Sequence, residues 1–114
     1  MMEHAMNLHP GPYAMIATGQ KTIELRLYDE KRQKIRVGDS ILFTNTKTGE
    51  QIRATVVKLH RFDSFAELYQ TLPLLQCGYT ADTVDTASSA DMNQYYSPEQ
   101  QSQYGALGIE LQLR

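Results

Sequence analysis

The stretch Thr18-Gly19-Gln20-Lys21-Thr22-Ile23-Glu24-Leu25-Arg26 decides how this sequence is interpreted. Beyond the glycine, two sets of residues alternate: Lys21, Ile23 and Leu25, and between them Thr22, Glu24 and Arg26. Such alternation predicts an extended strand with two different faces. Lys21 shares the parity of the apolar residues, so we expect its amine at the rim of the space that the apolar face of the strand encloses. Three charged residues near the start of one strand predict a site for an anion or a polar ring. The alternative is a salt-bridged strand edge, because surface ion pairs are common and contribute little.

The chemistry available to the three charged residues depends on which of them meet. A neighbouring carboxylate favours the charged form of a lysine, so Lys21 suits phosphate or carbonyl binding better than service as a free amine base. Lys21 and Glu24 are the candidate catalytic residues. If Glu24 accepts a proton from water while Lys21 polarises a carbonyl, amide hydrolysis follows. Parity argues against this pair, since positions 21 and 24 face opposite sides of a regular strand. Glu24 and Arg26 share a parity, and we expect them to form an ion pair that orients the site.

The flanking segments predict an α+β fold: a small, mostly antiparallel β-barrel with short peripheral helices. Alternating or apolar runs predict strands over 4–8, 21–28, 40–45, 51–60 and 104–113. Short helices are expected over 13–17, from Ser64 to before Pro73, over 91–96, and from an N-cap at Ser97. In the long strand the apolar residues change parity at Val57, which predicts a bulge or a bend of a closing barrel. Residues 74–90 are predicted to form a long connection.

Size and composition favour one globular domain over residues 1–114. Apolar residues make up 41% and charged residues 21%, which is ordinary for a globular protein. No apolar run approaches the roughly 20 residues that cross a bilayer, and the N-terminal sequence does not resemble a signal peptide. We therefore expect a cytoplasmic protein with no membrane partner. The single cysteine, Cys77, agrees with a reducing compartment and is expected to be a buried residue, not a nucleophile.

Charge is distributed unevenly along the chain. Residues 21–61 hold ten Lys and Arg against five Asp and Glu, a balance of +5, whereas residues 62–114 hold seven acids against Arg114, a balance of −6. A basic half on a mildly acidic protein indicates a local anionic partner, not a general polyanion binder. The alternative is that the solvated faces of the strands carry Lys and Arg. The three histidines lie far apart with no metal-ligand spacing, and no phosphate-binding or dinucleotide-binding glycine motif occurs. We therefore expect no metal and no cofactor.

Tyrosines offer the second half of a nucleobase site. Tyr95, Tyr96 and Tyr104 are candidates to stack on a base, a contact worth about 1 to 3 kcal/mol in single-strand recognition. Tyr28, which follows the central stretch, is a further candidate ligand-binding residue. The alternative for each of these rings is packing in or around the core.

Three blocks of this sequence together resemble a known family. They are Gly19-x-Lys21-Thr22-x-Glu24-x-Arg26, then Val37-Gly38-Asp39, and finally Tyr104-Gly105-x-Leu107-Gly108-Ile109-Glu110. Over nearly the whole chain the pattern is similar to the ASCH domain, the activating-signal-cointegrator homology family. The resemblance implies a PUA-like β-barrel and a cleft beside it that exposes Lys21, Glu24 and Arg26. It also implies an association with RNA or with modified nucleosides.

One branch of that family, the small bacterial amidohydrolases of 4-acetylcytidine, is similar to this chain in length. Lys21 matches the proposed catalytic lysine of this branch, Glu24 stands where it has a threonine, and Glu67 lies in the region of its distal acid. Other members are linked to ribonuclease action or to RNA binding without chemistry. We predict an RNA- or nucleotide-binding protein that uses this cleft. The alternatives are a hydrolase of an N-acylated cytidine-type nucleoside or a ribonuclease, and a protein-interaction module without a nucleic-acid ligand.

Overall fold

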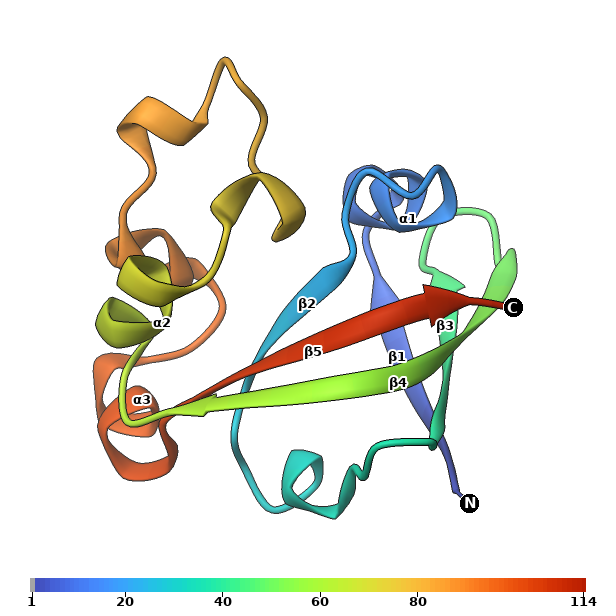
Figure 1. The fold of residues 1–114 in the computed structure, drawn as a ribbon, viewed down its shortest axis with the longest axis horizontal. Helices are drawn as coiled ribbons and strands as arrows, with labels where there is room; N and C mark the ends of the chain where they lie inside the picture. Colours follow the sequence, from blue (N-terminus) through green and yellow to red (C-terminus); the bar gives the residue numbers. More distant parts are fainter. Residues whose placement is uncertain (1) are drawn as a thin grey trace.

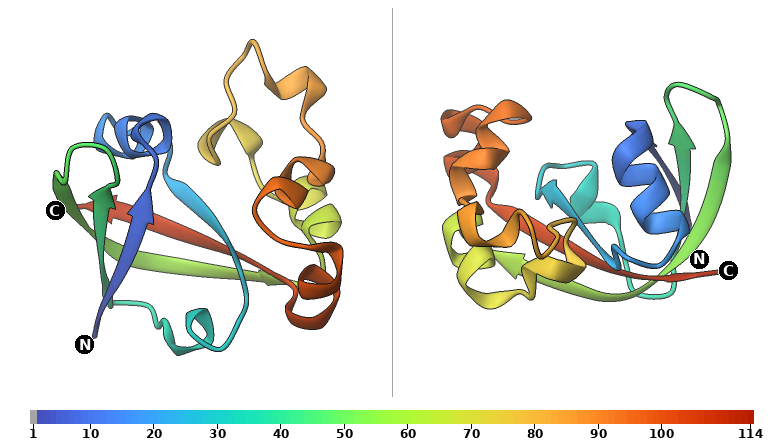
Figure 2. Two further views of the ribbon diagram at one scale, coloured as in Figure 1. Left: turned by 180° about the vertical axis from the view of Figure 1, so that it is seen from behind. Right: turned by 90° about the horizontal axis from the view of Figure 1, so that it is seen from above.

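A five-stranded mixed sheet forms the frame of the computed structural model, which describes residues 2–114. The strands, in the spatial order β1-β3-β4-β5-β2, are β1 (Glu3–Leu8), β3 (Ser40–Asn45), β4 (Gln51–Phe62), β5 (Ala106–Leu113) and β2 (Ile23–Leu27). β1 and β3 run parallel, and the other three pairs are antiparallel. The sheet curls into a half-barrel whose two edge strands are β1 and β2 (Figures 1 and 2). The prediction of an α+β, PUA-like and mostly antiparallel fold is confirmed.

Short helices occupy the connections between the strands. They are α1 (Pro10–Ala17), α2 (Phe65–Thr71), α3 (Pro98–Tyr104) and the 3₁₀ helices η1 (Arg32–Lys34), η2 (Leu74–Gln76), η3 (Val84–Thr86) and η4 (Ser89–Gln94). In Figure 1, α2, α3 and η4 gather at one end of the sheet, and α1 lies at the other, beside the start of β2. η2 also reaches the start of β2, where Gln76 O accepts the backbone N–H of Thr22. Among residues 2–114, no helix has the length and apolar character needed to cross a bilayer.

Side-chain caps explain where several helices begin. The hydroxyl of Ser64 accepts the backbone N–H of Glu67, which starts α2 as predicted. Ser97 and Gln100 form a full capping box at the start of α3, and proline occupies the first turn. Two helices have other bounds than predicted. α1 begins at Pro10, before the expected start at position 13, and the short helix expected over 91–96 is the 3₁₀ helix η4, Ser89–Gln94.

The long strand β4 bends at one residue. Val56 pairs with Leu111 and Lys58 with Glu110, so Val57 has no opposite partner in β5. This register shift is the bulge that the change of apolar parity predicted. It lets one strand of 12 residues follow the curl of the sheet.

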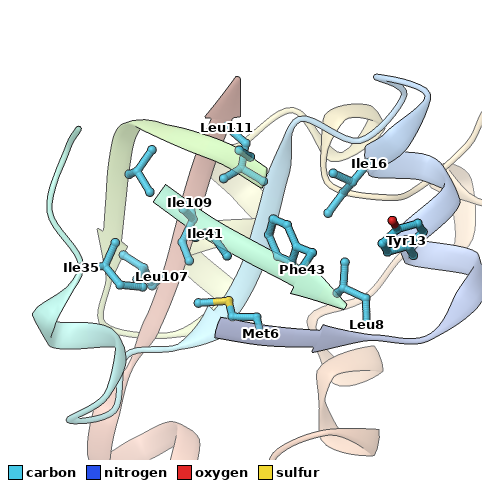
Figure 3. Packing of buried hydrophobic residues seen from close by; sticks show 12 residues of the cluster. Met6, Leu8, Tyr13, Ile16, Ile35, Ile41, Phe43, Leu107, Ile109 and Leu111 are labelled. Carbon is cyan, nitrogen blue, oxygen red and sulfur yellow. The ribbon is translucent and has the colours of Figure 1, made fainter. Parts of the chain in front are cut away.

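Two clusters of buried side chains stabilise the fold. The first fills the inside of the curl between the sheet and α1, as Figure 3 shows, and includes Ile16, Phe43 and Ile109. The second lies between the other face of the sheet and α2 with η4, and includes Leu25, Phe65 and Met92. The short strand β2 is therefore buried on both sides. A charged side chain on β2 is removed from water unless a cavity reaches it.

Several strand boundaries differ from the sequence prediction, and two of them concern predicted site residues. β2 begins at Ile23 and not at Lys21, because the backbone N–H of Lys21 donates to Met15 O and that of Thr22 to Gln76 O. β5 begins at Ala106 and not at position 104. Gly105, with φ +77°, separates it from α3.

Candidate functional site

Three charged side chains from the central stretch form one ion-pair cluster. Glu24 Oε1 lies 2.7 Å from Lys21 Nζ, and Glu24 Oε2 lies 2.8 Å from Arg26 Nε. The Glu24 side chain is only 4% exposed, and the two cations are 11% and 14% exposed. We call Lys21, Glu24 and Arg26 the charged triad. The predicted Glu24–Arg26 pair is present.

The prediction from strand parity was wrong for Lys21. It assumed that position 21 belongs to the strand, whereas Lys21 precedes β2 and its N–H is held by Met15 O of α1. A residue outside the ladder is not bound to the alternation of faces. The lysine amine therefore reaches the same carboxylate as Arg26.

The charged triad lies at the opening between the two edge strands. Arg26 Nη2 donates a 3.1 Å hydrogen bond to the backbone carbonyl of Asn7 on β1. β1 and β2 stand at opposite ends of the sheet order, so this bond joins the edges of the curl through a side chain. It also satisfies a carbonyl that an edge strand otherwise leaves to solvent.

Electrostatics keep Glu24 ionised. Burial raises the pKa of Glu24. The charges of Lys21 and Arg26, together with their hydrogen bonds, lower the pKa by more than burial raises it, so that it lies below its usual value. One carboxylate between two cations leaves the triad with a charge of +1. Both carboxylate oxygens are engaged, so Glu24 is a weak base and an effective positioner of the two cations.

A cavity of about 400 Å³ adjoins the charged triad. On one side its lining includes the triad, the end of β1 at Asn7 and Leu8, and Met15 of α1. On the other side it includes residues of α2, of η4 and of the loops around them: Tyr69, Cys77, Gly78, Tyr79, Asp91, Met92, Gln94, Tyr95 and Tyr96. Figures 1 and 2 show these two groups of elements on either side of the start of β2. Its volume falls in the range of small-molecule sites, roughly 300 to 1,000 Å³.

The loop beside Lys21 contains a glycine that its backbone conformation requires. Gly78 has φ +112°, and a Cβ atom built on it would lie 3.4 Å from Lys21 Cδ. L residues rarely adopt this φ, whereas the added Cβ atom would make an ordinary contact with the lysine side chain.

The predicted aromatic residues fall into two groups. Tyr95 and Tyr96 line the cavity. The Tyr95 side chain is largely exposed, whereas the Tyr96 ring stacks on Phe65, with ring centroids 6.1 Å apart. Tyr28 and Tyr104 do not line it.

Each of those two tyrosines has a partner elsewhere. The guanidinium of Arg61 lies 4.6 Å from the centre of the Tyr28 ring. Tyr104 donates a hydrogen bond to Glu30. Glu67, the distal acid suggested by the family resemblance, is exposed in the first turn of α2 and is not among the lining residues.

Three of the lining residues that were not identified from the sequence as site residues form a linked group. Tyr69, Tyr79 and Asp91 are linked by two hydrogen bonds of 2.7 Å on the wall opposite the charged triad. Tyr69 carried only the signal of a helix face, and the other two lie in segments without periodicity. Only the packing of residues 74–96 against α2 brings them together. Cys77 also lines the cavity; burial raises the pKa of its thiol to about 11, which agrees with an unreactive buried thiol.

The fold of this chain is also found in known proteins. The family model of the ASCH domain matches residues 6–113. This chain belongs to the ASCH domain family. The hypothetical protein PH0355 is 28% identical, with a TM-score of 0.79 and all of both chains covered. Protein PF0455 from Pyrococcus furiosus is also 28% identical, with a TM-score of 0.74 and with 98% of this ASCH chain and 97% of the other covered.

A more distant relative shows that the fold persists at low identity. A variant of the ASCH protein from Zymomonas mobilis is 16% identical, with a TM-score of 0.68, and the match covers 96% of this ASCH chain and 68% of the other. No curated protein shows significant sequence similarity to this chain.

Proposed function

We propose that this ASCH domain binds RNA or a nucleotide-like ligand in the cavity beside the charged triad. The observation that carries the proposal is a buried Glu24 carboxylate that holds two cations in the wall of a cavity. The triad has a charge of +1 in a partly desolvated setting, where it attracts a phosphate or polarises a carbonyl of a base.

An aromatic ring supports the same ligand class. Tyr95 is 56% exposed although it lines the cavity, so its ring is available to a planar ligand. Tyr96 is less available, because it already stacks on Phe65. Stacking on one exposed tyrosine together with a cationic cluster is a common way of binding a single-stranded nucleotide.

Binding is better supported than hydrolysis by the state of Glu24. A general base needs a free lone pair and a pKa near the working pH. Glu24 has both oxygens in ion pairs and a pKa below its usual value. An amidohydrolase that used this carboxylate would first have to release one of the two cations.

The proposal is tested with a short fluorescent single-stranded RNA. We expect binding at low salt and a fall in affinity as salt is added, because phosphate contacts release counterions. Substitution of Lys21→Gln should weaken binding, whereas Lys47→Gln, in the exposed β3–β4 hairpin, removes an equal charge and should change it little. Absence of binding at low salt, or an equal effect of the two substitutions, would contradict the proposal.

A second pair of variants tests the stacking contact. Tyr95→Ala should lower affinity about 5- to 150-fold, the equivalent of 1 to 3 kcal/mol per stacked base, while Tyr95→Phe keeps the ring and the affinity. Incubation of the protein with 4-acetylcytidine, followed by absorbance, tests the hydrolase alternative. Deacetylation that disappears in Lys21→Gln would replace the binding proposal with an enzymatic one.

A further inference from the structure

A hydrogen-bonded chain of three side chains forms part of the cavity wall opposite the charged triad. Tyr69 of α2 and Tyr79, from the loop after η2, have their hydroxyl oxygens 2.7 Å apart. The Tyr79 hydroxyl donates to Asp91 Oδ2 of η4, also at 2.7 Å. All three residues line the cavity.

The direction of this chain follows from counting protons. A phenol has one proton to donate, and Tyr79 gives it to Asp91 Oδ2, so Tyr69 must be the donor to the Tyr79 oxygen. Burial and the hydrogen bonds to Tyr69 and Asp91 raise the pKa of Tyr79 well above its usual value, which keeps its proton in place. The backbone N–H of Ser88 donates to the same Oδ2 atom at 3.2 Å. Asp91 is thus fixed through one oxygen only.

The other oxygen of Asp91, Oδ1, differs from the remaining carboxylate oxygens of the cavity lining in its hydrogen bonding. Glu24 and Asp91 are the two carboxylates among the lining residues. Glu24 has one oxygen on Lys21 and the other on Arg26. Asp91 Oδ1 accepts no hydrogen bond from any side chain or backbone group of residues 2–114. It is therefore the free carboxylate acceptor that the lining residues offer to a ligand.

We propose that Asp91 is a specificity-determining residue that accepts a hydrogen bond from the exocyclic amino group of a nucleobase in the cavity. The inference rests on the proposed function and adds the class of base to it. A carboxylate accepts from an amino group on a base edge. It repels a carbonyl oxygen at the same place, because two acceptors then face each other without a proton. Tyr79 is a positioning residue in this account, because it holds the other carboxylate oxygen.

A role confined to capping η4 does not explain the arrangement. The cap bond from the Ser88 N–H uses Oδ2, the same oxygen that accepts from Tyr79. An asparagine can supply one acceptor oxygen to both donors. The structural and the ligand-binding roles of Asp91 therefore use different oxygens, and an amide substitution separates them.

The test compares ligands that carry an amino or a keto group at the same ring position. AMP is paired with IMP and CMP with UMP, and each dissociation constant is measured by calorimetry. We expect the amino-bearing member of at least one pair to bind about 10- to 100-fold more tightly, as for a hydrogen bond to a charged group. In Asp91→Asn the preference should fall towards unity while affinity for the keto member stays the same or rises. A residue that only stabilised η4 would lower both affinities alike.

Controls keep the outcomes distinct. Asp85→Asn removes an equal charge from η3, outside the cavity lining, and should leave the preference unchanged. Tyr79→Phe deletes the donor that orients Asp91 and should reduce the preference in part. Equal binding of amino and keto members by the unmodified protein overturns the inference and leaves the proposed function standing. Failure of all four nucleotides to bind overturns the inference, and the RNA titration then decides the proposed function separately; neither result depends on how a variant folds.

Discussion

Replacing Glu24 by glutamine should destabilise this protein more than any other loss of a single charge on its strands. The substitution keeps the size of the side chain but removes the charge that compensates Lys21 and Arg26, whose nitrogens lie 2.7 and 2.8 Å from the carboxylate. Removing one partner of a buried ion pair costs about 3 to 5 kcal/mol. Because the two cations are 11% and 14% exposed and retain some solvent, we take the lower end, about 3 kcal/mol.

Urea denaturation followed by circular dichroism measures this loss. With an m value of about 1.5 kcal/mol/M, typical of a small domain, a loss of about 3 kcal/mol lowers the unfolding midpoint by about 2 M without changing the slope. The matched control is Glu3→Gln. Glu3 also forms a short ion pair, 2.6 Å from Arg53, but these side chains are 42% and 53% exposed. Solvent screens such a pair, so the control should move the midpoint by much less.

Comparable midpoints for the two variants would refute the reasoning, since burial is the main feature that separates them. A triple variant with Glu24→Leu, Lys21→Met and Arg26→Met extends the test. It removes all three charges together and should recover most of the lost stability, as buried ionic groups replaced by apolar side chains of similar volume often do.

Three further outcomes are expected. Gly105→Ala should lower the free energy of unfolding by about 2 to 4 kcal/mol, because φ is +77° and the new Cβ would lie 2.6 Å from Phe62 O. Gly19→Ala, with φ +81° and open space around the new Cβ, should lower it by about 1 to 2 kcal/mol. Equal denaturation midpoints for the two variants would contradict this. Hydrogen bonds from His4 and from two backbone N–H groups lower the pKa of Asp39 from 3.8 to about 2, so its stabilising effect is complete above pH 3.8 and is lost as the pH falls towards 2; urea midpoints of Asp39→Asn should lack this pH dependence. Cys77, with a pKa raised to about 11, should react with a thiol reagent at pH 8 only after denaturant is added, and rapid reaction of the native protein would contradict its burial.

Most of the secondary structure could be predicted from the sequence because its signals are local. A serine that caps the third following N–H, a proline in the first turn and alternation of apolar residues each act within a few residues. These signals located α2, α3 and the bulge of β4. The likeness of three short blocks to the ASCH family supplied the fold and the location of the charged triad.

The amino-acid sequence by itself determined which charged residues lie in β2 or directly before it, since the three lie within six positions of one another. Only the tertiary structure decided that Lys21 and Arg26 share one carboxylate. Hydrogen bonds from the backbone of Lys21 to α1 and of Thr22 to η2 keep these two residues out of β2, which begins two residues after the predicted start. The residues of the opposite cavity wall could not be predicted from the sequence either. Tyr69 and Asp91 are 22 positions apart and meet through Tyr79, a contact that depends on how an aperiodic loop packs against α2. Contacts of this kind leave no local pattern, because the free energy that forms them comes from burial in the folded chain.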